Sequence, residues 1–158
     1  MIKVLFVCLG NICRSPLAEA IFDHQVKARG LENSFSSDSC GTGGYHIGAD
    51  PDHRSQQVAQ KYGVPMKHAA RKFSSSDFQE FDYIIPMDQQ NYDDIVSATG
   101  RSHPGLMLMR KFDPETEGSA DVPDPYYGGQ DGFEKVYQML ERSNNEFLDF
   151  LVKQHNLR

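Results

Sequence analysis

Several features that would assign the protein to a class are scarce in its sequence. Three cysteines among 158 residues are too few, and an odd number, for a disulfide framework. No apolar stretch approaches the roughly 20 residues of a membrane-spanning helix. No small-residue cleavage site follows the short apolar run after Lys3. These absences favour a reducing compartment, and we expect a cytoplasmic protein without membrane insertion.

Positive charge is scarce as well. The chain has 16 Lys and Arg residues against 22 Asp and Glu residues, for a formal net charge of -6 at pH 7. Proteins that bind duplex nucleic acid need clustered Lys and Arg to replace the counterions that the phosphates release. We therefore expect no nucleic-acid partner, and any anion site must be local.

The rest of the composition fits an ordinary folded domain. Hydrophobic residues make up 39% of the chain and charged residues 24%, which is enough apolar side chain for a full core and unlike a disordered chain. Domains most often have about 100–150 residues, so residues 1–158 are expected to form a single domain. The sequence shows no internal repeat, linker or low-complexity tract.

The apolar residues follow a pattern that predicts alternating strands and helices. Ile2–Cys8 reads IKVLFVC, which is typical of a strand buried on both faces of a parallel sheet. After it, Ser15 and Pro16 are a typical N-cap and first-turn pair, and Gly30 is expected to end that helix. The other expected elements are strands at 35–39, 82–87 and 106–109, helices at 50–62, 88–99 and 133–151, and loops at 41–48 and 113–132.

This alternation predicts the α/β class: a four-stranded parallel sheet flanked by helices, with right-handed crossovers. Ligands of such sheets bind beyond the carboxyl ends of the strands, at the point where the strand order reverses. The loop that follows Cys8 is expected at this edge, where a ligand would bind.

The loop after the first strand combines a thiol with an anion-binding pattern. Residues 7–16 read VCLGNICRSP, with Cys8 at the end of the strand and Arg14 just before the expected helix. Gly10 and Asn11 both tolerate positive φ, so the N–H groups of the loop can converge on a phosphate at the helix N-terminus. The planar Arg14 guanidinium fits two phosphoryl oxygens at once. This positive cradle favours the Cys8 thiolate, a strong nucleophile.

Two residues of this loop have other interpretations. Ser15 can donate its hydroxyl to the Cys8 sulfur or cap the helix, and the two roles are compatible. Cys8 itself could be a small buried hydrophobic residue, although the strand, the Gly-Asn pair and the Ser-Pro helix start favour a catalytic role. Zinc binding requires ligand pairs at short spacing. The candidates do not supply such pairs, so no metal is expected: Cys8, Cys13, Cys40, His46, His53 and His68.

A second motif, DPYY at residues 124–127, supplies a candidate acid. A phenol has a pKa of about 10, so the departure of a phenolate at neutral pH benefits from a proton donor. Pro123 and Pro125 restrict the backbone around Asp124 and aim its carboxyl group. Asp-Pro is also a common turn dipeptide, and it is the upstream cysteine loop that favours the catalytic interpretation.

With these two motifs, the sequence resembles the low-molecular-weight protein tyrosine phosphatase family, most closely its bacterial members. The likeness covers essentially the whole chain, and the motifs stand in the family's order. The resemblance implies that Cys8 is the nucleophile, Arg14 the phosphate clamp and Asp124 the general acid and base. It implies an α/β fold whose phosphate-binding loop follows the first strand.

The resemblance also implies roles around this centre. Residues that would contact the phosphate or the substrate are Leu9, Gly10, Asn11, Ile12, Cys13, Ser15, Tyr45, Tyr126 and Tyr127. Supporting residues would be Ser39, His68 and Asp88, of which Ser39 and His68 would join Asn11 and Ser15 in a polar network that holds the loop. Tyr45 and Tyr126 would form the walls of the cleft, and Tyr45 stands where some relatives carry Trp. Without the resemblance, His68 and Arg71 would be ordinary loop residues and Asp88 a plain N-cap.

The expected function is hydrolysis of phosphotyrosine and other aryl phosphate monoesters through a cysteinyl-phosphate intermediate, without a cofactor. The expected partners are a phosphotyrosine protein as substrate and a cognate tyrosine kinase that phosphorylates it, and the expected state is a monomer. An arsenate reductase on the same fold would need two further thiols that relay a disulfide after Cys8 reacts, and Cys13 and Cys40 do not stand where such a pair would be. A protein-arginine phosphatase would carry Thr in place of Ile12, and a phosphocarrier would need neither Arg14 nor Asp124.

Overall fold

The apolar first strand lies in the middle of a parallel sheet. The structure is a computed structural model, and it describes residues 1–116, 118–126 and 128–157. Strand β1 (Ile2–Cys8) pairs in parallel with β2 (Phe35–Gly41) on one side and with β3 (Tyr83–Pro86) on the other. Both edges and both faces of β1 are therefore covered, and residues 4–7 are fully buried, as their apolar sequence predicts.

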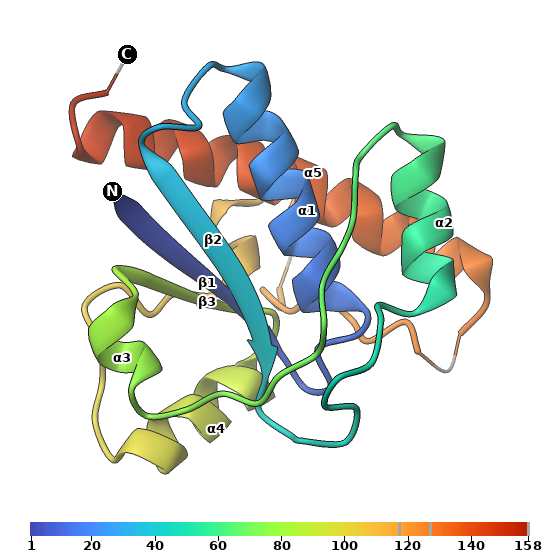
Figure 1. The fold of residues 1–158 in the computed structure, drawn as a ribbon, viewed down its shortest axis with the longest axis horizontal. Coiled ribbons are helices and arrows are strands. Elements are labelled where there is room, and N and C mark those ends of the chain that lie inside the picture. The colour runs from blue at the N-terminus through green and yellow to red at the C-terminus, as the bar shows by residue number, and fades with distance from the viewer. Residues whose placement is uncertain (117, 127, 158) are drawn as a thin grey trace.

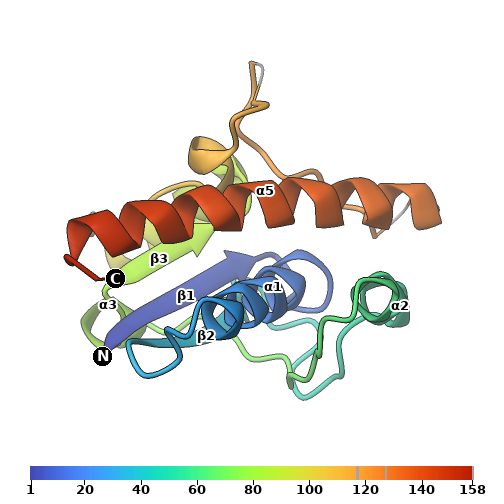
Figure 2. The same cartoon turned by 90° about the horizontal axis from the view of Figure 1, so that it is seen from above.

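Helices cover the two faces of this sheet, as Figures 1 and 2 show. Alternate side chains of a strand point to opposite faces. Val4 and Phe6 accordingly pack in one core with α1 and α5, whereas Leu5 and Val7 pack in a second core with α3 and α4. The helices are α1 (Arg14–Ala28), α2 (His53–Lys61), α3 (Asp77–Glu80), α4 (Gln89–Thr99) and α5 (Gln130–Gln154), with a 3₁₀ helix η1 at Met109–Phe112.

The expected fourth strand at 106–109 is wrong. The sheet in the described part of the chain has three strands, and Leu106 makes only an isolated bridge with Ile84. The Ile84 N–H donates to Gly105 O (2.9 Å) and the Met107 N–H donates to Ile84 O (3.1 Å), after which the chain leaves the sheet and enters η1. A short apolar run has the same pattern whether it extends a sheet or turns into the core.

Most helix ends follow the polar and glycine signals in the sequence. Asp88 caps α4, because its Oδ1 accepts the Asn91 N–H at 2.8 Å. Gly100 ends that helix in the left-handed region, with φ 68°. Helix α2 begins at His53, three residues after the expected start at 50, because the Asp52 side chain accepts the Arg54 N–H of the first turn.

The expected N-cap role of Ser15 is also wrong. Helix α1 begins at Arg14, so Ser15 lies within its first turn, and no side chain caps this helix. A capping side chain would occupy the backbone N–H groups that a helix N-terminus offers to an anion. The first turn of α1 therefore stays open toward the loop that precedes it.

Strand β2 continues to Gly41, two residues beyond the expected strand at 35–39, and this extension supports the loop after β1. The Gly43 N–H donates to Leu9 O at 2.9 Å. A Cβ atom at Gly41 would lie 2.6 Å from the same Leu9 oxygen, so a side chain at this position would push the two segments apart.

The C-terminal helix begins earlier than its apolar period indicates. Helix α5 starts at Gln130, inside the expected loop at 113–132. This start was not predicted because residues 130–132 are not apolar and so add nothing to the apolar period. As Figure 2 shows, this long helix lies across one face of the sheet beside α1. Among the helices that the structure describes, none has the length and apolar character to cross a membrane.

Candidate active site

The loop between β1 and α1 forms the floor of the candidate site. Cys8 ends the strand and Arg14 begins the helix, so the five residues between them turn the chain at the carboxyl edge of the sheet. Asn11 takes a left-handed conformation with φ 58°, which Asn tolerates better than most residues with a side chain. This conformation brings the Asn11 N–H to 3.3 Å from the Cys8 sulfur.

The Cys8 side chain is buried, yet its sulfur borders an open pocket. Ser15 Oγ lies 3.0 Å from Cys8 Sγ. The same hydroxyl accepts a hydrogen bond from Asn11 Nδ2 at 2.8 Å, so its single proton is available for Cys8 Sγ or for the Cys40 carbonyl at 3.3 Å. A hydroxyl and a backbone N–H are thus aimed at the sulfur. Both groups are placed to stabilise negative charge that develops on the sulfur.

The Arg14 guanidinium is buried and anchored at one end. Its Nη1 donates to Asp88 Oδ2 at 2.6 Å and to the Val122 carbonyl at 3.0 Å. Burial opposes the charge of Arg14, but the Cys8 thiolate and the hydrogen bond to Asp88 outweigh it and raise the Arg14 pKa. Asp88 therefore has two roles, because one carboxylate oxygen caps α4 and the other holds Arg14.

Asp124 reaches the same pocket from a segment far away in the sequence. Its Oδ2 lies 3.7 Å from Arg14 Nη2, and its Oδ1 accepts the Tyr126 N–H at 3.0 Å. The segment is tied to the end of β3, since the Val122 N–H donates to Met87 O at 2.8 Å. The Asp124 side chain is 40% exposed, so its carboxyl group is open to solvent and to a ligand.

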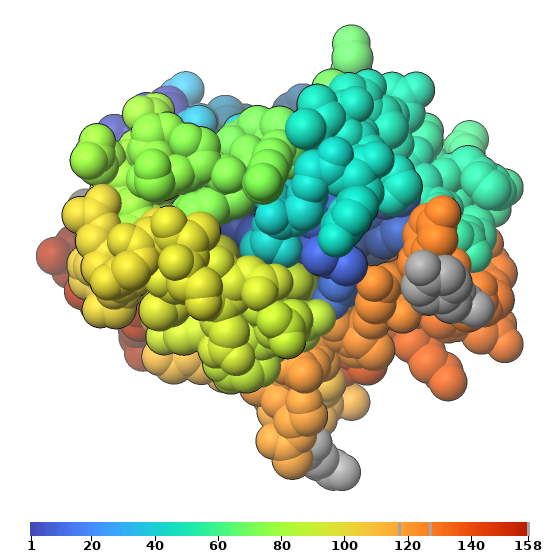
Figure 3. Space-filling model, turned by 90° about the horizontal axis from the view of Figure 1, so that it is seen from below, coloured from blue at the N-terminus to red at the C-terminus, as the bar shows by residue number. Residues whose placement is uncertain are grey.

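These groups line one pocket of about 460 Å³. Figure 3 shows the hollow: the blue N-terminal loop lies at its bottom, between cyan, yellow-green and orange parts of the chain. Tyr45 stands at its rim with 74% of its surface exposed. Tyr127 lies outside the described residues. The residues that line the pocket are Cys8, Leu9, Gly10, Ile12, Cys13, Arg14, Tyr45, His46, Asp124 and Tyr126.

Behind the loop, Asn11 uses its whole side-chain amide. Its Nδ2 donates to Ser15 Oγ (2.8 Å) and to Ser39 Oγ (3.0 Å). Its Oδ1 accepts from His68 Nε2 (2.8 Å) and from the Arg71 backbone N–H (3.0 Å). An amide has two donor hydrogens and two acceptor lone pairs, so Asn11 is fully satisfied. The structure thus brings together Asn11, Ser15, Ser39 and His68.

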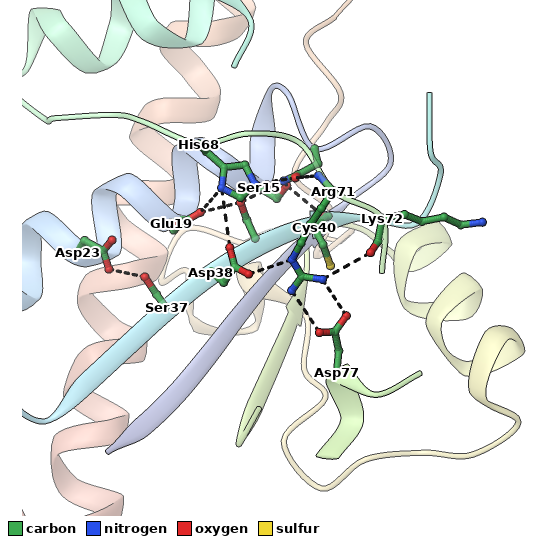
Figure 4. A network of polar contacts seen from close by, with 12 residues as sticks. Ser15, Glu19, Asp23, Ser37, Asp38, Cys40, His68, Arg71, Lys72 and Asp77 are labelled. Carbon is green, nitrogen blue, oxygen red and sulfur yellow. Dashed lines mark hydrogen bonds and ion pairs between the residues drawn. The ribbon is translucent and has the colours of Figure 1, made fainter. Parts of the chain in front are cut away.

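The network continues to charged groups that the sequence did not indicate, and Figure 4 shows them. Ser39 Oγ donates to Glu19 Oε1 at 2.7 Å, and His68 Nδ1 lies 3.4 Å from the same oxygen. Burial raises the Glu19 pKa to about 7, although the Ser39 hydrogen bond opposes this shift. Burial lowers the pKa of His68, against the attraction of Asp38.

Glu19, Asp38 and His68 also form the one group of three possible metal ligands found among the described residues, with ligand atoms within 4.8 Å of one another. The group already has partners from the protein. Arg71 Nε donates to Asp38 Oδ2 at 2.9 Å, and Ser39 donates to Glu19. These contacts make the group a support for the loop, and it lies apart from the residues that line the pocket.

The other two cysteines differ from Cys8 in their surroundings. Burial raises the Cys13 pKa to about 12, and the Asp52 carboxylate adds to this shift. Cys40 is fully buried, and burial raises its pKa well above the ordinary value. Both side chains are therefore neutral thiols at neutral pH.

Several residues of the site had no signal in the sequence. His46 lines the pocket, and a Cβ at Gly10 would lie 3.0 Å from its ring, so a side chain at Gly10 would press on His46. Gly10 is not among the glycines with positive φ. Glu19 lies on a helix face that also contributes to the core. Asp38 lies within a strand, where its acidic side chain among serines was the one available signal.

A cysteine held in an anion-binding loop between a strand and a helix, with an arginine and a carboxylate in the same pocket, defines a class of phosphate-handling proteins. Within it, the chain belongs to the low molecular weight phosphotyrosine protein phosphatase family, whose family model matches residues 3–157. The low molecular weight phosphotyrosine protein phosphatase of Schizosaccharomyces pombe is 49% identical over 150 residues, 93% of this chain and 95% of that protein.

Solved structures agree with this family. The crystal structure of YfkJ from Bacillus subtilis has a TM-score of 0.90 and 40% identity, covering 98% of this chain and 96% of that one. The structure titled Drosophila arginine phosphatase has a TM-score of 0.87 and 34% identity, covering 95% and 98% of the two chains. The family and the parallel sheet flanked by helices are confirmed, whereas the individual residue roles stay predictions.

Proposed function

We propose that the protein is a tyrosine phosphatase that hydrolyses phosphotyrosine and other aryl phosphate monoesters through a cysteinyl-phosphate intermediate. One observation carries the proposal: the Cys8 sulfur, the Arg14 guanidinium and the Asp124 carboxyl group line a single pocket of about 460 Å³. They supply a nucleophile, an anion clamp and a proton donor within reach of one phosphate group.

In the first step, the Cys8 thiolate attacks phosphorus as the bond to the aryl oxygen breaks. The charge of the transition state spreads over the three remaining phosphoryl oxygens. The N–H groups of the loop and the Arg14 guanidinium bind these oxygens, and Asp88 and Val122 O hold the guanidinium in place. The protonated Asp124 carboxyl group donates its proton to the departing phenolate.

In the second step, Asp124 acts in reverse. Its carboxylate accepts a proton from a water molecule, which attacks phosphorus while the phosphorus–sulfur bond breaks. The sulfur leaves as a thiolate. Ser15 Oγ at 3.0 Å and the Asn11 N–H at 3.3 Å are placed to stabilise that charge. Residues of this chain account for each proton and each charge, so the proposal includes no metal ion or cofactor.

The walls of the pocket support an aromatic substrate. Leu9, Ile12, Tyr45 and Tyr126 offer apolar and aromatic surface around the sulfur, which suits a flat phenyl ring. We propose that the substrates are phosphotyrosine proteins in the cytoplasm, phosphorylated by a tyrosine kinase. We also propose that the protein acts as a monomer, because one chain supplies all the residues of the pocket.

Protein-arginine phosphatase activity is a second candidate, because the chain is similar to the Drosophila arginine phosphatase structure at 34% identity. Ile12 argues against it, since an apolar side chain in the pocket wall fits a ring better than it fits a charged guanidinium group. Arsenate reduction has less support. It would need relay thiols, and both Cys13 and Cys40 are buried neutral thiols.

The test measures hydrolysis of phenyl phosphate, a phosphotyrosine peptide and a phosphoarginine peptide in EDTA. Turnover of the first two in preference to the third is expected, together with retained phosphate binding but loss of turnover in Cys8→Ser. Preference for phosphoarginine would favour the second candidate. The proposal would be abandoned if no aryl phosphate were hydrolysed or if Cys8→Ser kept substantial activity.

A further inference from the structure

Arg54, on the first turn of α2, contacts the segment that follows Asp124. Its Nη1 donates to the Gly128 carbonyl at 3.2 Å. Its guanidinium carbon lies 5.5 Å from the ring centroid of Tyr126 and 4.6 Å from that of Phe133. At these distances a guanidinium interacts favourably with the face of an aromatic ring. One side chain therefore joins α2 to three positions along residues 126–133.

The Arg54 fork is itself held in place. Asp52 accepts from Arg54 Nε at Oδ1 and from Nη2 at Oδ2, both at 3.0 Å. Burial would raise the Asp52 pKa, but the hydrogen bonds from Arg54 outweigh burial and lower it, so the pair is ionised at neutral pH. A paired, planar guanidinium loses less freedom on making further contacts than an unpaired side chain does.

Asp52 also contacts the phosphate-binding loop. Its backbone N–H donates to the Ile12 carbonyl at 2.8 Å. From the same first turn of α2, Ser55 Oγ donates to the Cys13 carbonyl at 3.3 Å. The start of α2 is therefore bonded to two segments. The Asp52 N–H and the Ser55 hydroxyl bind the loop after Cys8, and Arg54 binds the segment after Asp124.

That segment needs such an attachment. Two of its hydrogen bonds are local: the Tyr126 N–H donates to Asp124 Oδ1 at 3.0 Å, and the Gly128 N–H donates to Pro125 O at 3.0 Å. Local bonds give the turn its shape but do not fix it relative to the rest of the molecule. Val122, before Asp124 in the chain, is bonded to Met87 at the end of β3, and Arg54 supplies a contact after Asp124, at Gly128.

We propose that Arg54 is a positioning residue that latches the segment carrying Asp124 onto α2 and so keeps the acid over the nucleophile. The inference rests on the proposed role of Asp124 as proton donor. Arg54 does not line the pocket, so it acts on the reaction through Asp124 rather than through the phosphate. Without it, Asp124 spends less time in position, and substrates with poor leaving groups are the most affected.

The test compares kcat/KM for phenyl phosphate with kcat/KM for nitrophenyl phosphate, whose better leaving group depends less on an acid. In Arg54→Ala, the ratio of phenyl to nitrophenyl values should fall about tenfold, and Arg54→Lys should recover only part of it. In the double variant with Asp124→Asn, the Arg54→Ala change should have almost no further effect on phenyl phosphate, because both changes remove the same contribution. Arg29→Ala, on the exposed Arg29–Asp149 ion pair, is the matched control and should leave the ratio unchanged.

Hydrogen exchange gives a readout that does not depend on activity. The amides of Asp124, Tyr126 and Gly128 should exchange faster in Arg54→Ala, while those of β1 should not. If Arg54→Ala does not fold, Asp52→Asn replaces it, since Asn still caps a helix but lacks the charge that holds Arg54. The latch would be overturned by any of three results: an unchanged ratio of phenyl to nitrophenyl kcat/KM, fully multiplicative losses of kcat/KM in the double variant, or unchanged amide exchange. An inactive wild type with faster exchange in Arg54→Ala would instead refute the proposed function and leave the latch intact.

Discussion

The two loops that meet in the pocket are held in opposite ways. Residues 11–13 of the loop after β1 are buried, and the single Asn11 side chain makes four hydrogen bonds beneath the loop. The segment around Asp124 lies at the surface, turns on local hydrogen bonds, and exposes 40% of the Asp124 side chain. One loop has its shape fixed before any ligand arrives. The other is attached at its ends and open in the middle.

The difference matches what each loop has to do in the proposed reaction. An anion clamp works best when its donors are already oriented, because no reorganisation is then needed as the charge develops. A group that first donates and later accepts a proton must admit both the substrate and a water molecule. Changes in the rigid loop should therefore damage every substrate equally, while changes around Asp124 should depend on the leaving group.

The largest effect is expected from Arg14→Lys. Lysine keeps the charge but lacks the planar fork that meets two phosphoryl oxygens, so kcat should fall by about a hundredfold or more. The loss should be the same for phenyl and nitrophenyl phosphate, since the clamp binds phosphate and not the leaving group. Steady-state kinetics on the two esters checks this. A near-normal kcat would show that Arg14 contributes only to a general positive field.

Asp124→Asn should have the next largest effect, and it should depend on the substrate. A positioned general acid contributes roughly 10²–10⁴-fold, so kcat/KM for phenyl phosphate should fall by about a hundredfold and that for nitrophenyl phosphate by much less. Phosphotyrosine should follow phenyl phosphate. If both esters lost activity equally, Asp124 would only order its segment, and Asp88 or Asp121 would become the candidate acid.

Two substitutions of Asn11 separate the contribution of its side-chain hydrogen bonds from that of its left-handed backbone conformation. Asn11→Gly keeps the left-handed backbone but removes four buried hydrogen bonds, and should lower the free energy of unfolding by about 2–3 kcal/mol. Asn11→Ala loses the same bonds and adds a cost of about 1 kcal/mol for positive φ. Chemical denaturation of both variants measures the difference. Equal stability of the Gly and Ala variants would mean that backbone strain at Asn11 is unimportant.

The smallest expected effect is on the pH dependence of the free energy of unfolding, through Glu19. Its pKa is raised from 4.5 to about 7 by burial, so the folded state binds a proton more tightly than the unfolded state between these pH values. Stability contributed by the protonated form is complete below the unfolded pKa and is lost as the pH rises through the folded pKa, by up to about 3 kcal/mol. His68, whose pKa is lowered, acts in the opposite direction as the pH falls.

Glu19→Gln isolates the first of these two contributions. The variant should lose less stability than the wild type between about pH 5 and pH 8, which thermal melts across that range would measure. Glu32→Gln, at an exposed glutamate on the turn before β2, is the matched control for replacing a carboxylate with an amide. Parallel curves for wild type and Glu19→Gln would contradict a buried, proton-binding Glu19.

The rigid loop could be predicted from the sequence because its signals are local. A continuous apolar strand, a Gly-Asn pair and a helix start follow one another within residues 2–16, and the structure places all three as expected. Ser15 was predicted in part. The expected contact between its hydroxyl and the Cys8 sulfur is present at 3.0 Å, whereas the expected helix cap is absent.

The supports of both loops were harder to predict because they come from distant positions. Glu19, Asp38 and Arg71 meet behind Asn11 only after β2 pairs with β1, and no spacing in the sequence brings them together. The same is true of Arg54, whose partner Gly128 is 74 residues away. The fourth strand failed for a different reason, since a four-residue apolar run does not distinguish a strand from a buried turn.

The measurement that tests the central claim most directly is detection of phosphate on Cys8 during turnover. Asp124→Asn should slow hydrolysis of the intermediate, because the carboxylate that activates water is gone. This variant, mixed with nitrophenyl phosphate and quenched by denaturation, should show a phosphorus–sulfur species by phosphorus NMR, and mass spectrometry should place it on the peptide that contains Cys8. Cys8→Ser should show no such species and no turnover. Release of nitrophenol without any phosphorus–sulfur species, at a rate that Cys8→Ser retains, would contradict the account.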